Sequence, residues 1–305
     1  MGPGGLQALV KNGWPVEGRK IVVAGTGPLL LAVADGLKKH GAEIISINEQ
    51  APLSRVLGFG LGLLRHPAKL LQGAQVKLRL AGVPHRSSVW PVRAEGDRRV
   101  RSVTLTDGRK TWTETCDVLA CGFHLVPNVE LPLGLGCSLD GGFVAVDEWQ
   151  ATSVENVFCA GEPTGIGGAE GALAEGQIAG HFAAGRREEA RRLFTSRARW
   201  HQFRAALAAA YALRPEVKAP AADDTIFCRC EDVTFGHLKS FSSWRAAKLQ
   251  TRCGMGPCQG RICGTAAKLL FATGPESVRP PFFPARISSL LTISTGPATI
   301  LKTKH

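Results

Sequence analysis

The chain has 305 residues, of which 44% are hydrophobic and 20% are charged, and it carries a formal net charge of +12. A chain of this length can bury two domain cores, and this composition excludes a disordered or fibrous protein. No apolar run is long enough to cross a bilayer, and the first residues lack the hydrophobic segment of a signal peptide. We therefore predict a folded, cytoplasmic protein without a membrane span.

The first predicted elements are those of a nucleotide-binding βαβ unit. Residues 20–24 form a short run rich in β-branched side chains, residues 29–39 have helical composition, and residues 43–47 form a second strand-like run. Residues 52–82 are predicted to be mainly helical, with glycine and proline interruptions. This order favours a Rossmann-like α/β fold.

The loop between the first strand and the first helix begins like a dinucleotide fingerprint. Gly25 and Gly27 match its first two glycines, but Leu30 occupies the position of the third. Glu49 follows the second strand, where an acidic residue can bind a ribose hydroxyl. The loop indicates NAD(P) or another adenine nucleotide as a ligand. The alternative is a βαβ unit that packs without binding a nucleotide.

Later elements follow the same mixture of strands and helices. Residues 99–121 carry a hairpin signal between two alternating runs and end in an apolar strand, and residues 143–162 suggest a further strand pair. Residues 168–213 are predicted to be helical, and residues 213–225 to be a linker. The arginine-rich part of the helical segment favours a solvated face or a contact between subunits, because no nucleic-acid motif accompanies it.

Five of the nine cysteines gather in the last part of the chain. In a reducing compartment such clusters indicate metal ligands or redox groups. Cys228 and Cys230 are two apart, so both can point to one side of an extended segment. Cys258 and Cys263 straddle a glycine-rich turn that leads into a predicted helix, whose positive end would face the thiolates. Four thiolates suit an iron-sulfur cluster or structural zinc, and the spacing alone leaves both open. Three arginines are predicted to offset the remaining negative charge: Arg229, Arg252 and Arg261.

The sequences CRCEDVT and TRCGMGPCQGRIC around these cysteines resemble the bacterioferritin-associated-ferredoxin-like 2Fe-2S domain that ends several flavin-dependent dehydrogenases. The resemblance implies a 2Fe-2S cluster with four ligands: Cys228, Cys230, Cys258 and Cys263. Many relatives have alanine where this chain has Cys253, which implies a spare residue, either a small core side chain or a redox-sensitive neighbour. The other cysteines stand singly and are predicted to fill the core: Cys116, Cys121, Cys137 and Cys159.

Two further segments, DVLACGFHLVPN and ATSVENVFCAGEPTGIGG, resemble the flavoproteins of the pyridine nucleotide-disulfide reductase type. In these proteins a strand returns from the NAD-like domain to the FAD domain, and an acidic residue at its end approaches FAD. The resemblance implies that residues 157–162 end such a strand and that the following glycines let the backbone close on the flavin. The residues implied are Gly161, Glu162, Gly165, Gly167 and Gly168.

From Gly5 to about Pro284 the chain resembles the FAD-dependent alpha-type subunits of opine oxidase, hydroxyproline or proline dehydrogenase, and hydrogen cyanide synthase. The resemblance implies an N-terminally truncated member: a Rossmann-like NAD-type domain and a partial FAD domain of the pyridine nucleotide-disulfide oxidoreductase type, then a small helical 2Fe-2S domain. The expected divisions are a connecting segment (1–16), the NAD-like domain (17–112), the C-terminal part of the FAD domain (113–185), a helical segment and linker (186–222), the cluster domain (223–284) and a tail (285–305).

The resemblance also implies a function. The subunit would relay electrons between FAD and the cluster, while a flavin-containing partner subunit oxidises a secondary amine, an amino acid or an opine. No catalytic base is predicted, since His85 and His124 stand alone. Two alternatives remain at this point: a noncatalytic iron-sulfur scaffold subunit, and a zinc-stabilised nucleic-acid-binding protein.

Overall fold

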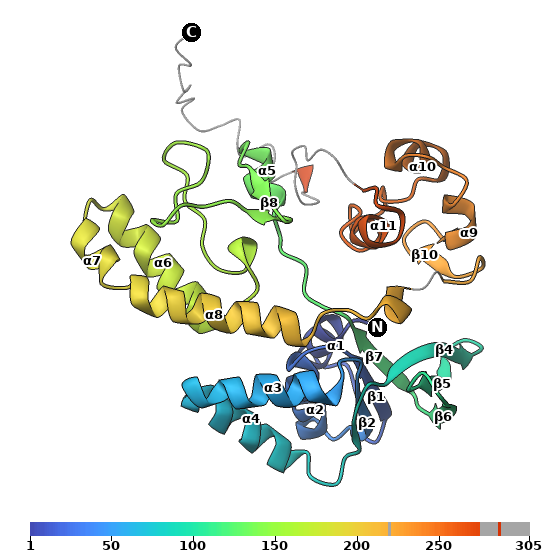
Figure 1. Ribbon diagram of the computed structural model, residues 1–305. Coiled ribbons are helices and arrows are strands. Elements are labelled where there is room, and N and C mark those ends of the chain that lie inside the picture. The colour runs from blue at the N-terminus through green and yellow to red at the C-terminus, as the bar shows by residue number, and fades with distance from the viewer. Residues whose placement is uncertain (219–220, 275–285, 288–305) are drawn as a thin grey trace. The chain divides into compact units, whose positions relative to one another are not determined.

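The computed structural model describes residues 1–218, 221–274 and 286–287 (Figure 1). The chain divides into two compact units. The first comprises Met1–Pro127, Glu148–Gln150 and Ala160–Ala219, and the second comprises Asn128–Asp147, Ala151–Cys159 and Pro220–His305. The end of the predicted cluster domain, residues 275–284, and the predicted tail apart from 286–287 lie outside the described residues.

A four-stranded parallel sheet organises the first unit. Its order is β3-β2-β1-β7, with β1 at Lys20–Gly25, β2 at Glu43–Glu49, β3 at His85–Ser87 and β7 at Val118–Gly122. On one side of β1, Ile21 pairs with Ile44, and on the other side with Val118, both in parallel register. The predicted βαβ unit is confirmed, and α2 spans Leu29–Lys39 as expected. The sheet continues past the boundary at residue 112 that we predicted for the NAD-like domain, because β7 completes it.

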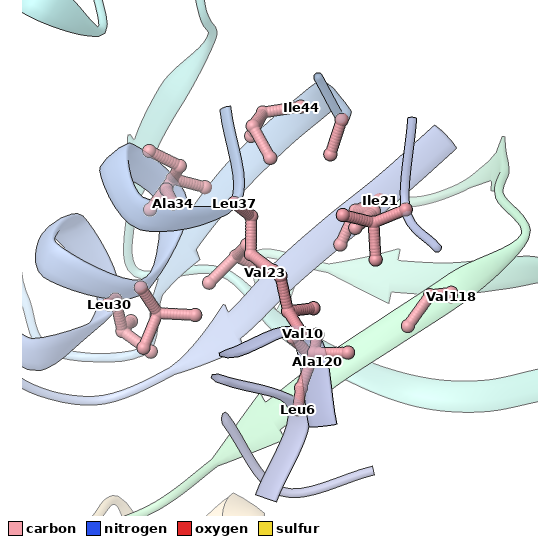
Figure 2. Packing of buried hydrophobic residues seen from close by; sticks show 14 of the residues in the cluster. Leu6, Val10, Ile21, Val23, Leu30, Ala34, Leu37, Ile44, Val118 and Ala120 are labelled. Carbon is pink, nitrogen blue, oxygen red and sulfur yellow. The ribbon is translucent and has the colours of Figure 1, made fainter. Parts of the chain in front are cut away.

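Helix α1 (Pro3–Lys11) belongs to the same core. Leu6 and Val10, one helical turn apart, point into the cluster formed by β1, β2, β7 and α2 (Figure 2). Leu30, which replaces the third fingerprint glycine, is also buried there at 3% exposure. The segment predicted to be a connection, residues 1–16, is therefore part of the first unit. The prediction missed this helix because its two glycines and its proline weaken the helical signal.

A separate three-stranded antiparallel sheet follows, in the order β4-β5-β6. It consists of β4 (Trp90–Gly96), β5 (Val100–Thr106) and β6 (Thr111–Thr115). The predicted hairpin joins β5 and β6: Asp107 Oδ1 accepts hydrogen bonds from the backbone N–H groups of Arg109 and Lys110, both at 2.9 Å. Gly108 takes the left-handed conformation that this turn requires, with φ at 87°.

Most of the remaining helices of the first unit confirm the helical predictions for 52–82 and 168–213; the short helices at 162–164 and 215–218 lie outside both ranges. The remaining helices are α3 (Leu53–Gly62), η1 (Leu63–Arg65), α4 (Pro67–Arg79), η2 (Glu162–Thr164), α6 (Ala169–Ala183), α7 (Arg187–Arg191), α8 (Phe194–Ala210) and η3 (Pro215–Lys218). Helix α8 packs against both α3 and α6. In the described ranges no helix has the length and apolar character that crossing a membrane would need.

The second unit contains short elements. Its first part holds α5 (Glu130–Gly134) and a two-stranded ladder of β8 (Leu139–Asp140) and β9 (Phe143–Val144), and its later part holds β10 (Ile226–Cys228), β11 (Val233–Thr234), α9 (Phe235–Leu238), α10 (Trp244–Thr251) and α11 (Cys263–Phe271). The strand pair predicted within 143–162 is wrong: beyond β9 the described backbone makes only the isolated bridges Val146 to Thr152 and Ala151 to Phe158. A continuous ladder needs a facing strand, and none of the described strands faces this segment.

Candidate functional site

The later part of the second unit, residues 221–274, contains the five clustered cysteines and is called the cysteine domain. Its small core contains cysteines as well as apolar residues. The buried members are Cys228, Val233, Leu238, Trp244, Ala247, Cys253, Cys263 and Ala267. Strand β10 ends at Cys228, and α11 begins at Cys263, so both side chains are fixed at the ends of regular elements. The helix predicted after Cys263 is confirmed.

Three of these thiols lie against one another. The Sγ atoms of Cys228, Cys253 and Cys263 are all within 4.8 Å of each other, and all three residues are buried. The family resemblance implied Cys228 and Cys263 as ligands and Cys253 as a spare residue that could replace one of the named ligands. The structure brings it into the same group of thiols. The only sequence signal for this was its place in the glycine-rich segment next to Cys258.

Cys230 and Cys258 form a second pair in this domain. Cys230 is exposed and Cys258 is half-buried. A backbone N–H at Cys258 lowers the pKa of Cys230, but the hydrogen bond with the Cys258 thiol, desolvation and the charge of Cys228 together raise it. All five cysteines of the cysteine-rich motifs therefore belong to one domain, and the four predicted ligands are distributed between an inner group and an outer pair.

The thiols of the inner group share protons unequally. The pKa of Cys263 is lowered to about 6, chiefly because the Cys253 thiol donates a hydrogen bond to it, while burial opposes the shift. Further hydrogen bonds from the Cys228 thiol and the Gly264 backbone N–H act in the same direction. The same hydrogen bond raises the pKa of Cys253, which keeps its proton. One sulfur is thus held as a thiolate by its neighbours.

Glycines bring the cysteine loop close to its surroundings. Gly254 has φ at 83°, and a Cβ there would lie 2.7 Å from the ring of Trp244; a Cβ on Gly256 would lie 2.2 Å from the Cβ of Cys230. The predicted role of these glycines in curling the turn is confirmed. Two of the arginines predicted to offset the thiolate charge instead pair with carboxylates: Arg252 with Glu231 at 2.8 Å, and Arg261 with Glu130 at 3.1 Å.

The donor set fits a thiophilic metal centre. Cysteine thiolates are the ligands of both 2Fe-2S clusters and structural zinc, and soft sulfur donors select against magnesium and calcium. In this domain three buried thiols and two more exposed ones are close enough to influence one another's pKa. The three buried thiols are therefore close enough together to bind one metal ion.

The glycine turn of the Rossmann-like sheet does not fit the predicted contact between Glu49 and a ribose. Glu49 is 3% exposed, and both of its carboxylate oxygens are engaged. Oε2 accepts from the Gly27 N–H at 2.6 Å, and Oε1 accepts from the Thr26 hydroxyl and the Ala51 N–H, each at 2.8 Å. Burial raises the pKa of Glu49, and these hydrogen bonds partly offset the increase. The carboxylate binds the loop from inside instead of facing a ligand.

The end of helix α8 completes this polar network. The Gln50 amide donates to Thr26 Oγ1 at 2.9 Å and to the Ala212 carbonyl at 3.2 Å, and its oxygen accepts from the Arg214 N–H at 3.0 Å. Tyr211 is buried, which raises its pKa to about 12. Because residues of the chain itself occupy the donors and acceptors of the turn, we derive no nucleotide contact from it. Gly25 has a packing role: a Cβ there would lie 1.8 Å from the Gly122 carbonyl oxygen.

The five residues predicted to contact FAD lie in one loop before α6. Gly161, Gly165 and Gly168 have positive φ angles, and Glu162 Oε1 accepts from the Gly168 N–H at 3.1 Å. The strand predicted at 157–162 is absent from the described structure, where Phe158 forms only an isolated bridge. Its expected neighbours would be the strands of an FAD-type sheet, and the described residues hold no such neighbours.

The side chain of Arg204 lies beside two of these glycines, Gly165 and Gly167. The Arg204 guanidinium donates to the Thr164 carbonyl at 3.1 Å, and a Cβ on Gly165 would lie 2.1 Å from its Nη1 atom. A Cβ on Gly167 would likewise lie 3.4 Å from Arg204. Arg204 therefore lies against Gly165 and Gly167, and the contact of this loop with FAD stays a prediction.

Sequence reasoning missed Glu175, the residue that fixes this loop. It lies inside α6 at 3% exposure and accepts from the Gly161 N–H and the Thr164 hydroxyl, each at 2.7 Å. His201 Nε2 lies 2.8 Å from its other oxygen. The sequence signal for this role was an acidic residue, one helical turn after Gly171, inside an alanine-rich helix.

The two histidines that were considered as catalytic bases lie in different places. His85 lies in β3, where burial lowers its pKa, and His124 follows β7.

The scattered cysteines match the core prediction in part. Cys116 and Cys137 are buried, and Cys121 and Cys159 are half-buried. Desolvation raises the pKa of Cys116 and Cys121 to about 11 each, so both thiols stay protonated. They are unreactive structural residues under neutral conditions.

The fold and these segments define a class of protein. The chain belongs to the pyridine nucleotide-disulphide oxidoreductase family, whose family model matches residues 6–176. This is a family of oxidoreductases that use FAD, NAD(P) or both. The Rossmann-like fold class and the resemblance to FAD-dependent oxidoreductase subunits are confirmed.

The similar proteins have more specific names than the family. The chain is 31% identical to the A component of the opine oxidase of Rhizobium meliloti, over 94% of this chain and 70% of that protein. It is 30% identical to hydrogen cyanide synthase subunit HcnB of Pseudomonas aeruginosa, over 85% of this chain and 62% of that protein. It thus spans less than two thirds of the HcnB length. The structure of L-proline dehydrogenase from P. horikoshii shares the fold, with a TM-score of 0.54 and 18% identity over 90% of this chain and 50% of that one.

Proposed function

We propose that this chain is the electron-relaying subunit of a flavin-dependent dehydrogenase or oxidase that acts on a secondary amine, an amino acid or an opine. Family membership supports the redox class, and the relatives named as oxidase and synthase subunits support a subunit that works with a partner. The proposed partner is the flavin-containing subunit that oxidises the substrate. The nine cysteines, all without disulfides, support a reducing compartment such as the cytoplasm.

The observation that carries the proposal is the convergence of the cysteines in one domain. Cys228, Cys230, Cys258 and Cys263 are proposed to hold a 2Fe-2S cluster, which when bound supplies one-electron transfer to a flavin system that receives electrons in pairs. The chain's own groups prepare this site. Burial excludes water from Cys228 and Cys263, and the N–H of Gly264 stabilises the thiolate of Cys263.

The proposal assigns no proton transfer to a residue of this chain. Glu49 and Glu175 are buried carboxylates, but each accepts hydrogen bonds from backbone N–H and hydroxyl groups of a neighbouring loop. We therefore propose that substrate oxidation takes place in the partner subunit and that this chain positions the redox centre.

A second candidate follows from the contacts that the chain itself makes with the two glycine loops. Because Arg204 fills the space beside Gly165 and Glu49 binds the turn at Gly27, the chain could serve as an iron-sulfur scaffold that holds no flavin itself. Like the relay subunit, this scaffold would hold the 2Fe-2S cluster, but it would bind no flavin.

One experiment separates these candidates. The full chain is purified without oxygen, and its ultraviolet-visible spectrum is recorded together with iron, zinc and flavin analysis. Iron, acid-labile sulfide and flavin together support the relay subunit, whereas iron and sulfide without flavin support the scaffold. A colourless protein with neither iron nor flavin contradicts both.

A further inference from the structure

Cys253 is not needed by the proposed cluster, yet it is the most deeply buried of the five cysteines. Its side chain is 0% exposed, against 2% for Cys228 and 1% for Cys263. Its Sγ lies within 4.8 Å of both of their sulfurs. By contrast, the proposed ligand Cys230 is exposed. The buried group therefore contains three cysteines, of which the proposed cluster uses two.

The backbone holds Cys253 in this inward position. The preceding residue, Arg252, ends α10 in a left-handed conformation with φ at 63°, and its guanidinium is fixed by Glu231 at 2.8 Å. The Cys253 N–H donates to the Thr251 hydroxyl at 3.1 Å. The following residue, Gly254, is also left-handed and packs on Trp244. A left-handed non-glycine residue costs free energy, so this orientation of Cys253 is imposed by its surroundings.

The three sulfurs are near the spacing of a metal site. Thiolates on a tetrahedral zinc ion, with zinc-sulfur bonds of about 2.3 Å, lie about 3.8 Å from one another. The observed limit of 4.8 Å is within about 1 Å of that spacing.

We propose that Cys228, Cys253 and Cys263 form a buried three-thiolate site for a single thiophilic divalent cation of the zinc class. On binding, three sulfur-metal bonds form, and the protons still held by the three thiols are released to solvent. The fourth position of a tetrahedral ion stays open to solvent or to another thiol. Since the site shares Cys228 and Cys263 with the proposed cluster, the inference rests on the proposed function in this respect, and the two metal states exclude each other.

This site gives the domain a metal-bound state in the absence of iron. Its small core includes the three thiols, whose Sγ atoms all lie within 4.8 Å of one another. A single zinc-class ion would bind the three thiols of this core before the cluster is assembled. Cys253 is the residue that distinguishes the two states, because only the three-thiolate site requires it.

The test uses the full chain, purified anaerobically and stripped of metal, and titrated with Cd²⁺ as the probe. The wild type is expected to bind one Cd²⁺ with sulfur-to-cadmium absorption in the ultraviolet. Cys253→Ala is expected to weaken that binding by about a hundredfold or more, since thiolates supply most of the affinity of such sites. Cys137→Ala is the matched control: it removes a buried thiol outside the cysteine domain and leaves Cd²⁺ binding unchanged.

A second variant and a second metal complete the test. Cys253→Ser keeps nearly the volume of the thiol, its fold is checked by far-ultraviolet circular dichroism, and the same loss of Cd²⁺ affinity is expected. After anaerobic reconstitution with iron and sulfide, both Cys253 variants are expected to regain the visible absorption of the cluster. Unchanged Cd²⁺ affinity in the folded variants overturns the inference. So does loss of the cluster in them, which would make Cys253 a cluster ligand. A wild type that binds Cd²⁺ through three thiolates but never binds iron would contradict the proposed function and would still support the three-thiolate site.

Discussion

The glycine turn at residues 25–27 and the cysteine domain were both predicted to bind cofactors, and they satisfy their polar groups in different ways. In the turn, Glu49 accepts three hydrogen bonds from the chain, and Gln50 links Thr26 to the end of α8. In the cysteine domain, three buried thiols have mainly one another as partners. The difference shows where the proposed bound group belongs: the chain itself satisfies the polar groups of the turn, whereas the three thiols offer ligands to a metal.

The largest effect is expected from removing an inner thiol. Cys228→Ser should reduce the iron content of anaerobically purified protein from a full complement to none, because a hydroxyl is a poor ligand for iron in such clusters. Iron analysis and the visible spectrum measure this. Cys116→Ser, a buried thiol of the first unit, serves as control and should keep its iron. Full iron in Cys228→Ser would show that this residue is not a ligand.

The next effect concerns the core of the first unit. Leu37→Ala should lower the free energy of unfolding by about 2–5 kcal/mol, because Leu37 is 1% exposed and the substitution leaves a cavity. Denaturant unfolding followed by circular dichroism measures the change. Leu78→Ala, at a residue that is 76% exposed, should change stability by less than about 0.5 kcal/mol. Equal effects for the two variants would contradict the assigned core.

The third prediction concerns the buried carboxylate that binds the glycine turn. Glu49→Gln should cost about 1–3 kcal/mol at neutral pH, because an amide NH₂ replaces an acceptor that faces backbone N–H and hydroxyl donors. Since burial raises the pKa of Glu49 above 4.5, the folded state binds its proton more tightly than the unfolded chain. Its contribution to stability therefore falls as pH rises from 4.5 through the folded pKa. The variant should lack this dependence, and a retained slope would assign it to another group.

The smallest effect is expected at a buried carboxylate of the same unit whose partner side chains are exposed. Arg79 donates two hydrogen bonds to Asp35, at 2.8 and 2.9 Å, and lowers the pKa of Asp35 to about 2. Asp35→Asn should cost only about 1 kcal/mol at neutral pH, because the partner side chains are 43% and 58% exposed and solvent screens the pairs. The lowered pKa stabilises the fold above pH 3.8, and this contribution disappears as pH falls toward 2. Urea titrations at several pH values should show that the free energies of unfolding of the wild type and Asp35→Asn become equal as pH falls toward 2.

The sequence predicted the regular elements of the first unit because their signals are local. Residues 20–49 alternate between β-branched runs and a helical face, and the structure has β1, α2 and β2 there. What could not be predicted depends on distant partners. The inward turn of Glu49 requires Thr26 and Ala51, the burial of α1 requires the sheet, and the inclusion of Cys253 with Cys228 requires the loop to fold back. Residues 157–162 have strand composition but lack a facing strand among the described residues.

The comparison of the two regions is tested most directly by hydrogen exchange of the full chain before and after the metal is removed with a chelator. We expect protection to fall sharply in β10, α10 and α11 after removal, and to stay unchanged in β1, β2 and β7. Protection that survives in the cysteine domain without metal, or that is lost equally from the parallel sheet, would contradict the claim that only the cysteine domain needs a bound group.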